Sequence, residues 1–353
     1  MSLQCAKCKS FACRTGHSDA VPEDCPMNAD FPQFDELYAT DDRRDAAYQS
    51  ALVEALGYCR WTRLREIAEF AERMGYARVG VAHCGDMARE AVLTALYLRD
   101  RALEARLPPE KYKCDPLGQA QRFASENTQL NVIAGMCVGH EAIFIRASQA
   151  PVTVLVARDE RFCHNPAAAL YTADSYSHSQ LFGRRKRSER VPFRGWDQDT
   201  LSELADTLQP AQHDEWCRLE ETMEFAHRLG VTHIGVSFCV GFRNEARLLT
   251  RVLEANAFRV SSTCCKTGSI PKEELGILDS QKVRPNQLEM ICNPLAQAEL
   301  LNRAEVQLVL VLGQCVGHDA ATLANVQAPA VCVVAKDRVL AHNTVAALYE
   351  LEG

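Results

Sequence analysis

Hydrophobic residues along the chain fall into two kinds of segment that alternate. Residues 62–74 and 217–229 place apolar side chains at helical spacing, and each segment stops at a glycine, Gly75 or Gly230, which commonly ends a helix. The segments LNVIAGM, VTVLVA, VQLVLVLGQ and AVCVVA are apolar almost throughout, which is typical of strands buried on both faces. The alternation predicts an α/β fold with doubly wound, flavodoxin- or Rossmann-like parallel sheets.

This pattern occurs twice because part of the chain is duplicated. RWTRLREIAEFAERMGYARVGVAHC at 60–84 matches EWCRLEETMEFAHRLGVTHIGVSFC at 215–239, and CDPLGQAQ at 114–121 matches CNPLAQAE at 292–299. Self-similarity over such a length indicates two copies of one structural unit. The second copy is 23 residues longer between the two matches. We interpret the extra residues as a strand, FRVSST, that the first copy lacks, together with the segment after it.

The duplication divides the chain into four predicted parts. These are a cysteine-rich metal-binding cap, a degenerate first α/β unit, a polar linker and a complete second α/β unit, at residues 1–34, 35–171, 172–211 and 212–351. The linker contains the basic run Arg184-Arg185-Lys186-Arg187 among other polar residues. Such a run predicts a solvated segment rather than a phosphate-binding patch.

Composition narrows the classes of function. The net charge of −7 argues against a general nucleic-acid-binding protein, because proteins that track phosphates are usually basic. No apolar run approaches the roughly 20 residues that span a membrane, and the first residues lack the apolar core of a signal peptide. We therefore expect a cytoplasmic protein without a membrane partner. In that reducing compartment, sixteen cysteines favour metal ligation or thiol chemistry over disulfides.

Three cysteines and two histidines recur in register, each near the end of a predicted strand or the start of a predicted helix. In open parallel sheets, ligands bind at the carboxyl edge, in the crevice where the strand order reverses. The histidines fit either metal ligation or hydrogen bonding to a ligand. The recurring residues are Cys84, Cys114, Cys137, His140 and His164 in the first copy and Cys239, Cys292, Cys315, His318 and His342 in the second.

Cys114 and Cys292 each precede the start of a predicted helix. The Asp-Pro and Asn-Pro pairs at 115–116 and 293–294 are typical of a helix N-cap followed by proline in the first turn. Backbone N–H groups and the helix dipole favour a thiolate at such a position. The thiolate is the form that binds metals and attacks electrophiles.

The second copy carries further thiols. Cys264-Cys265-Lys266 ends the predicted extra strand at the same edge. We therefore expect one complete metal centre in the second copy, with Lys266 and His318 as candidates for proton delivery or anion binding. Its predicted ligands are Cys239, Cys264, Cys265, Cys292 and Cys315. Cys163 is a candidate to compensate for the absence of the Cys-Cys-Lys segment from the first copy. Cys59, Cys217 and Cys332 have no counterpart and are interpreted as packing residues.

The first residues form a separate cysteine cluster. Cys5, Cys8, Cys13 and Cys25 lie in CAKCKSFACRTGHSDAVPEDCP, which opens with Cys-x-x-Cys and ends in Cys-Pro. Four such thiols suit a structural zinc ion, and the Cys-Pro ending is equally typical of a 4Fe–4S cluster. The segment is too short and polar to fold on hydrophobic burial alone, so we expect a metal to order it.

Several of these motifs together resemble a cysteine-rich microbial family of unknown function that is usually labelled "metal-binding protein". They are the cap and the segments GVSFCVGFRNEA, CCKTG, CNPLAQAELLN, GQCVGHD and VVAKDRVLAHN. The resemblance covers the cap and essentially all of 212–350, and it implies metal binding without an established reaction. Family members are expected to have one cap and one α/β unit. This chain departs by duplicating the unit in a form without Cys-Cys-Lys, so a metal in the first unit stays an open question.

Three classes of function remain. The favoured one is an iron–sulfur protein, with 4Fe–4S as the preferred cluster, a redox or sulfur-handling role, and an electron-transfer partner or small-molecule substrate. The second is a zinc protein with a structural or metal-handling role. The third is a metal-free thiol enzyme with Cys264 or Cys292 as nucleophile, although no base and orienting group adjoin either residue. The sequence contains no Gly-x-Gly-x-x-Gly after the first strand and no P-loop, which argues against nucleotide binding.

Overall fold

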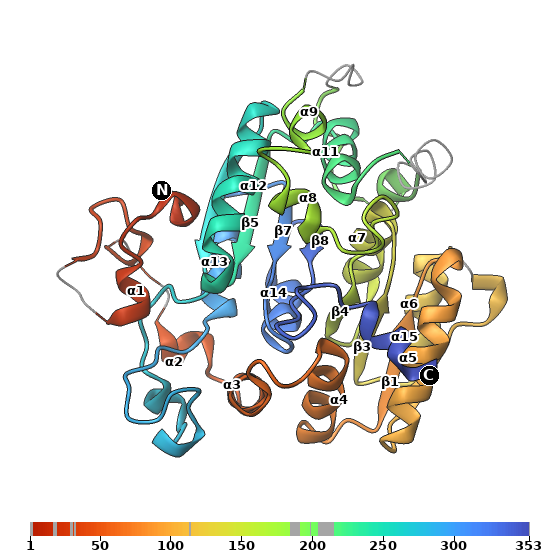
Figure 1. The fold of residues 1–353 in the computed structure, drawn as a ribbon, viewed down its shortest axis with the longest axis horizontal. Helices are drawn as coiled ribbons and strands as arrows, with labels where there is room; N and C mark the ends of the chain where they lie inside the picture. The colour runs from red at the N-terminus through yellow and green to blue at the C-terminus, as the bar shows by residue number, and fades with distance from the viewer. Residues whose placement is uncertain are drawn as a thin grey trace.

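The fold is built on two all-parallel sheets of four strands, lying side by side in Figure 1. The computed structural model describes residues 3–16, 20–28, 31, 33–112, 114–183, 191–197, 199–203 and 215–352. The first sheet has the order β2-β1-β3-β4, with β1 Arg78–Ala82, β2 Glu104–Arg106, β3 Leu130–Ala134 and β4 Val152–Val156. The second has the order β6-β5-β7-β8, with β5 His233–Phe238, β6 Arg259–Cys264, β7 Leu308–Leu312 and β8 Ala330–Val334. The predicted doubly wound α/β fold is confirmed.

Helices connect the strands in the same sequence in both units. Pro116 and Pro294 both stand at the start of a helix, after an Asp115 or Asn293 side chain that accepts a backbone N–H, as the sequence predicts. The main helices of the first half are α3 Asp41–Gly57, α4 Arg63–Arg73, α5 Ala88–Asp100, α6 Pro116–Ser125 and α7 Val138–Ala147. Those of the second half are α11 Arg218–Arg228, α12 Arg243–Ala255, α13 Pro294–Arg303 and α14 His318–Asn325. Shorter helices are α1 Ala12–Thr15, α2 Phe34–Leu37, α8 Ala167–Tyr171, α9 His178–Leu181 and α15 Ala346–Tyr349.

The prediction that the first copy lacks a strand is wrong. Glu104 of β2 pairs with Arg78 of β1 in the same register that joins Arg259 of β6 to His233 of β5, so the two edge strands are equivalent. β2 escaped detection because it has three residues, of which only the central alanine is buried. The true insertion is the segment that follows β6 and ends before Cys292.

The two units are interlocked. α14 of the second unit packs against β4 of the first, and α7 of the first packs against β8 of the second. Near the C-terminus, Val345 and Leu348 are buried in the same hydrophobic cluster as Val79 of β1. Each sheet therefore obtains part of its cover from the other unit.

The cap docks on the free edge of the second sheet. Gln4 forms a parallel bridge with Ser262 of β6, the Ser262 N–H donates to Leu3 O over 2.7 Å, and the Ala6 N–H donates to Ser262 Oγ over 2.9 Å. From the cap the chain runs through α2 and α3 beneath the sheets and reaches α4 (Figure 1). The contacts of Leu3, Gln4 and Ala6 with Ser262 hold the first residues against β6.

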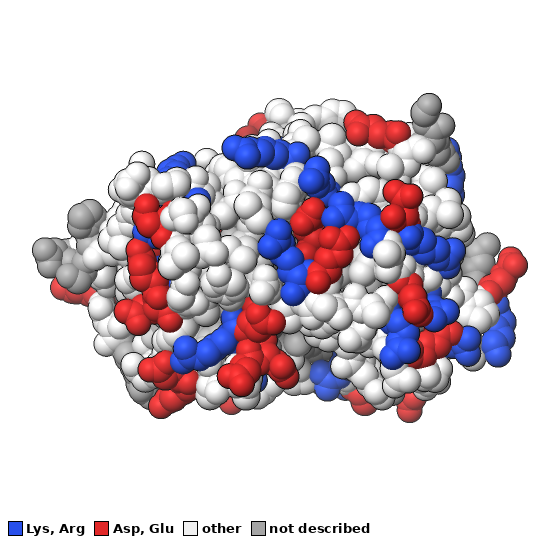
Figure 2. Space-filling model, turned by 90° about the horizontal axis from the view of Figure 1, so that it is seen from below, with Lys and Arg blue, Asp and Glu red and all other residues white. Residues whose placement is uncertain are grey.

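The remaining surface features bear on the sequence predictions. Leu181 and Leu201, from the predicted linker, are buried in the core of the second unit, while the basic run at 184–187 lies outside the described residues. Figure 2 shows acidic and basic side chains interspersed over one face of the molecule. Among the described residues, none of the helices combines the length and apolar character that a membrane crossing requires.

Candidate metal centres

The carboxyl edge of each sheet gathers thiols, and all sixteen cysteines are free of disulfides. We define site 1 as Cys84, Cys114, Cys137 and His140 in the first unit, and site 2 as Cys239, Cys265, Cys292 and Cys315 in the second. In both sites one cysteine lies within two residues of the end of the unit's first strand, and another lies in the loop after its third strand. The remaining thiols come from the loops that follow the edge strand.

Site 1 has the spacing of a single-ion site. Cys84 Sγ lies 3.8 Å from Cys137 Sγ and 3.6 Å from His140 Nδ1, and all three side chains are buried. Ligands around a tetrahedral ion with bonds of about 2.0–2.3 Å lie roughly 3.3–3.8 Å apart. These three residues could therefore hold a metal ion without rearrangement.

Cys114 adds a fourth donor to site 1. Its backbone has a positive φ of 59°, and its Sγ accepts a hydrogen bond of 3.3 Å from the Gly85 N–H. The hydrogen bond from Cys84 and the Gly85 N–H together outweigh desolvation and lower the pKa of Cys114 to about 6. Cys114 is thus a thiolate near neutral pH, which is the form that ligates metals.

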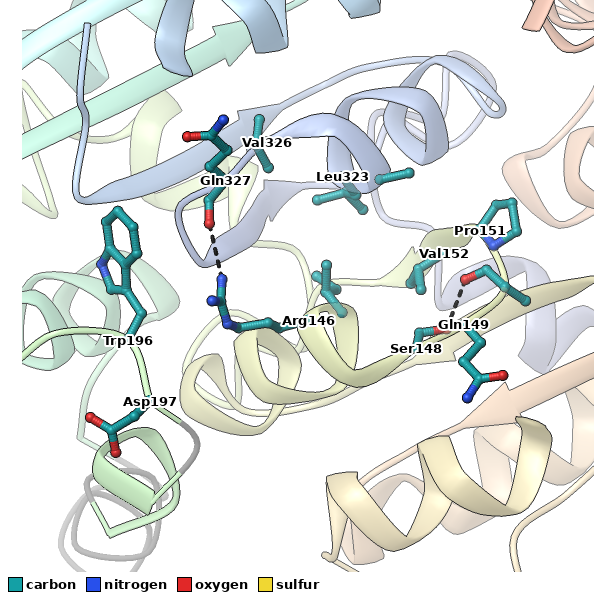
Figure 3. Close-up of a pocket in the computed structure, with 13 residues that line it drawn as sticks. Arg146, Ser148, Gln149, Pro151, Val152, Trp196, Asp197, Leu323, Val326 and Gln327 are labelled. Carbon is teal, nitrogen blue, oxygen red and sulfur yellow. Dashed lines mark hydrogen bonds between the residues drawn. The ribbon is translucent and has the colours of Figure 1, made fainter. Parts of the chain in front are cut away.

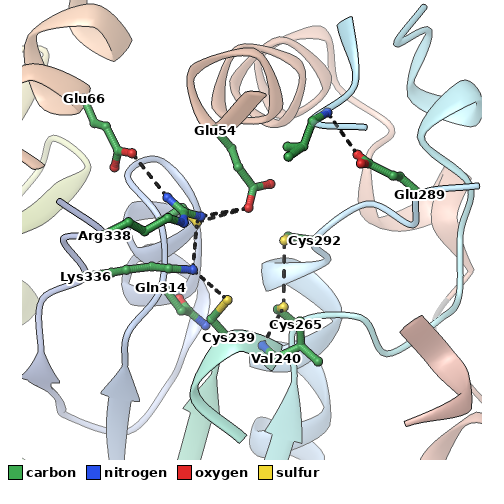
Figure 4. Close-up of polar contacts among 12 residues, drawn as sticks. Glu54, Glu66, Cys239, Val240, Cys265, Glu289, Cys292, Gln314, Lys336 and Arg338 are labelled. Atoms are coloured by element: carbon green, nitrogen blue, oxygen red, sulfur yellow. Dashed lines mark hydrogen bonds and ion pairs between the residues drawn. The ribbon is translucent and has the colours of Figure 1, made fainter. Parts of the chain in front are cut away.

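Site 2 also contains the buried amine of Lys336, which Figure 4 shows beside Cys239. Cys265 Sγ and Cys292 Sγ are 3.8 Å apart. Lys336 Nζ lies 3.0 Å from Cys239 Sγ and 3.6 Å from Cys315 Sγ. One ammonium group therefore bridges two of the four sulfur atoms.

Cations dominate the surroundings of site 2. Arg338 Nη2 donates to Cys315 Sγ over 3.1 Å. Burial opposes the charge of Lys336, but the neighbouring Cys239 and Cys315 more than offset it and raise its pKa. Hydrogen bonding from Cys265, together with the charges of Lys266 and His318, lowers the pKa of Cys292 despite burial. Cys292 is thus the thiol of site 2 whose ionised form the surroundings favour, whereas hydrogen bonds to neighbouring thiols and burial raise the pKa of Cys239, Cys265 and Cys315.

Sequence reasoning missed Lys336 and Arg338, although a signal for the first exists. Lys336 stands just past the end of β8 in AKD, and its counterpart in the first unit is Arg158 in ARD, just past the end of β4. Arg158 is buried as well, and the charges of Cys84 and Cys137 help to raise its pKa against desolvation. A cation that recurs at a strand end was therefore visible in the repeat.

Carboxylates reach each site from outside its own sheet. Glu54 of α3 pairs with Arg338 over 2.9 Å and lies 3.6 Å from Cys315 Sγ. Glu66 of α4 also pairs with Arg338, over 3.3 Å. In the first unit Glu221 of α11, the counterpart of Glu66, accepts the Val138 N–H next to Cys137 over 2.8 Å. The site of each sheet thus receives a carboxylate from the helix that precedes the other sheet in sequence.

The two sites differ in which cysteine fills one position. In site 2 the Val240 N–H donates to Cys265 Sγ over 3.3 Å, as the equivalent Gly85 N–H donates to Cys114 in site 1. Cys114 therefore occupies in space the position of Cys265, although its sequence counterpart is Cys292. As a result, site 1 has three thiols and a histidine, whereas site 2 has four thiols.

Cys264 lies with the cap rather than with site 2. Successive side chains of a strand point to opposite sides, and Cys264 interacts with Cys5 and Cys13 of the cap as well as with its neighbour Cys265. Burial raises the pKa of Cys264, and a hydrogen bond to Cys13 adds to the shift. Burial likewise raises the pKa of Cys5 to about 12. The five-cysteine centre expected from sequence is therefore divided between two places joined by the Cys264–Cys265 peptide.

The recurring histidines outside site 1 have two different positions: His318 lies at site 2, whereas His164 and His342 bond within their own loops. His318 is buried, and Cys292 and Cys315 help to raise its pKa against desolvation. Its Nδ1 has no hydrogen-bond partner among the described residues. His164 and His342 instead accept the N–H of Asp159 and Asp337 through Nδ1, over 3.3 and 3.1 Å, and close their own loops.

The remaining cysteines lie apart from these groups. Cys217 is the N-cap residue of α11, and Cys332 lies within β8, as expected of packing residues. Cys59 and Cys163 are exposed. A cavity of about 900 Å³ (Figure 3) is lined by Ser148 and Val152 at the amino end of β4, the edge opposite to the thiols.

Three comparisons show which known proteins this chain is similar to. The model of a family described as "Protein of unknown function (DUF1847)" matches residues 25–107, 106–155 and 187–333. "Uncharacterized protein MJ0455" of Methanocaldococcus jannaschii is 36% identical over 149 residues, covering 42% of this chain and 75% of the relative. An aspartate racemase homologue, PH1733 from Pyrococcus horikoshii, aligns with 78% of this chain and 98% of its own, at 12% identity and a TM-score of 0.19.

Proposed function

We propose a function for this chain, which belongs to the family described as "Protein of unknown function (DUF1847)". In this proposal the chain is a cysteine-ligated metalloprotein, and its site 2 holds an iron–sulfur cluster with a redox or sulfur-handling role. The observation that carries the proposal is the convergence of Cys239, Cys265, Cys292 and Cys315 from separate loops around the Lys336 ammonium. Four thiolates are the usual ligand set of such clusters.

The breadth of site 2 supports a cluster over a single ion. Among the described residues, Cys84, Cys137 and His140 are the group whose ligand atoms all lie within 4.8 Å of one another. The four thiols of site 2 form no such group but are in contact in succession, because Cys239 interacts with Cys315 and Cys265, and Cys265 Sγ lies 3.8 Å from Cys292 Sγ. In a cluster each thiolate binds a different iron, so the ligands stand farther apart than around one ion. A cluster bound there would exchange single electrons.

The residues around site 2 have definable tasks. Lys336, Arg338 and Lys266 balance the negative charge of the thiolates, which four sulfur ligands would otherwise concentrate in a buried place. Hydrogen bonds to the sulfurs and net local charge are the levers by which proteins set cluster potentials. His318, which faces Cys292 and Cys315, is placed to hold a proton near the centre.

Site 1 supports zinc as a second occupant. Cys84, Cys114, Cys137 and His140 form a Cys₃His set, which is a common structural zinc combination. The 3.6 Å between Cys84 Sγ and His140 Nδ1 is the observation that favours one small ion there. Zinc has no redox chemistry, so its role would be structural.

The cap fits as a further centre that relays electrons to site 2. Its thiols, Cys5, Cys8, Cys13 and Cys25, are half-buried. Cys5 and Cys13 lie near Cys264, whose neighbour Cys265 belongs to site 2. The electron donor is then a separate redox protein, and the compartment a reducing one such as the cytoplasm.

The test is the content of iron, zinc and acid-labile sulfide per chain, measured on protein purified without oxygen. We expect iron with matching sulfide, and a marked loss of both in Cys315→Ala. Cys332→Ala, a buried cysteine outside every site, is the matched control and should retain the full content. Zinc without sulfide, or an unchanged iron content in Cys315→Ala, would remove the cluster from site 2.

A further inference from the structure

The insertion after β6 builds a small pocket beside site 2. Most of its lining comes from that insertion, including Lys266, Lys272, Arg284 and Glu289, and its volume is about 140 Å³. Since one water molecule occupies about 30 Å³ in the liquid, the pocket has room for a molecule of a few heavy atoms. The first unit, which passes from Arg106 to Cys114 without this insertion, has no corresponding segment.

The inner wall of the pocket contacts the thiols of site 2. Val240 lines the pocket, and its N–H donates to Cys265 Sγ over 3.3 Å. Glu54 lines it from α3 and lies 3.6 Å from Cys315 Sγ. Lys266 also lines the pocket and is adjacent to Cys265 in sequence. A molecule in the pocket is therefore next to the site.

The lining is positively charged on balance. It contains four cations, Arg14, Lys266, Lys272 and Arg284, and two carboxylates, Glu54 and Glu289. Glu54 is neutralised by Arg338 over 2.9 Å, and Glu289 by Lys272 over 2.8 Å. Lys266 Nζ donates to Met290 O over 2.6 Å, and an ammonium has three donors, so further donors remain. Arg14 and Arg284 are exposed.

We propose that this pocket binds a small inorganic oxyanion of the size of sulfite or sulfate, and that this anion class is the substrate of site 2. The second clause rests on the function proposed above. Guanidinium and ammonium groups are the usual partners of oxyanions because charge-assisted hydrogen bonds are strong and directional. The size of the pocket suits a small anion, and the Glu54 and Glu289 carboxylates are already paired with cations.

The experiment is a calorimetric titration of the anaerobically purified chain with sulfite and with sulfate at constant ionic strength. The two arginines at the pocket are changed together, as Arg14→Gln with Arg284→Gln, because both are exposed and their loss should leave the fold intact. Arg303→Gln, an exposed arginine on α13 outside the pocket, is the matched control. We expect saturable binding that weakens about tenfold or more in the double variant and is unchanged in the control.

Metal content, measured on the same samples, separates the two proposals. If the metal content is full and neither anion binds, or if the double variant binds as tightly as the parent, the oxyanion pocket is refuted while the metal centre stands. If the chain has no iron yet binds the anion with the expected loss in the double variant, the pocket is supported and the cluster fails.

Discussion

The guanidinium of Arg218 donates a hydrogen bond of 2.6 Å to the carboxylate of Glu141, and neither side chain reaches solvent. Arg218 precedes the second sheet, whereas Glu141 belongs to α7 of the first unit. An equivalent pair joins the units in the opposite sense: Arg63 of α4, in the first unit, pairs with Asp319 of α14, in the second, and both side chains are buried. These two buried ion pairs fix how the units are oriented relative to each other. They thereby also fix the positions of Glu66 at site 2 and Glu221 at site 1.

Removing one partner of this pair should be costly. Arg218→Met leaves the Glu141 carboxylate buried and uncompensated, so we expect a loss of about 3–5 kcal/mol in unfolding free energy. The exposed pair Arg194–Glu203 is the control, because solvent screens it and Arg194→Met should change the unfolding free energy far less. Urea denaturation measures both variants. Similar transition midpoints for the two would contradict a structural role for the buried pair.

The division of Cys264 from Cys265 predicts different metal losses in double variants. Cys239→Ala should empty site 2, and adding Cys265→Ala should then remove no further metal because both thiols serve the same centre. Adding Cys264→Ala to Cys239→Ala should lower the metal content again, because Cys264 adjoins the cap thiols. Elemental analysis of the purified variants gives the comparison. The reverse order of losses would place Cys264 in site 2.

Gly317 of the repeated Cys-Val-Gly-His phrase should resist substitution. Its φ is +81°, and a Cβ there would lie 1.9 Å from Ser50 Oγ and 2.8 Å from a Phe70 ring carbon. Gly75 also has a positive φ, but a Cβ at that position meets no atom within 4 Å. Gly75→Ala should therefore cost about 1–2 kcal/mol from backbone strain alone, and Gly317→Ala clearly more. Equal thermal midpoints for the two variants would show that α3 yields to the new methyl group.

Asp159 should make stability depend on pH. Burial raises the pKa of its carboxyl to about 6, against hydrogen bonds from the Arg218 and Phe162 N–H groups. Because the folded state then binds the proton more tightly than the unfolded state, its contribution to stability falls as the pH rises through 6. Between pH 5 and 8 the unfolding free energy of the parent should fall by about 1 kcal/mol relative to Asp159→Asn. A difference that is flat over this range would contradict the raised pKa.

Much of the fold could be predicted from the sequence because it depends on local periodicity. The apolar runs at β3, β4, β7 and β8 are buried over their full length, and the helices with Pro116 and Pro294 begin where the caps indicated. β2 could not be recognised, because an edge strand with one buried residue carries no hydrophobic signature.

The sites were harder to predict because they depend on relations between distant segments. The repeat indicated that Cys84, Cys137, Cys239 and Cys315 lie at sheet edges, but it paired Cys114 with Cys292, whereas space pairs it with Cys265. Strand alternation and the docking of the cap decide that Cys264 faces the cap and Cys265 faces site 2. The arrival of Glu54 and Glu66 at site 2 follows from the exchange between units, which no local pattern encodes.

The most direct measurement for site 2 is anomalous X-ray scattering from crystals of the anaerobically purified chain, recorded on both sides of the iron and zinc absorption edges. The proposal predicts an iron signal surrounded by Cys239, Cys265, Cys292 and Cys315, separate from any zinc signal at Cys84, Cys137 and His140. No anomalous signal among the four thiols of site 2, or a signal there that appears only above the zinc edge, would contradict it.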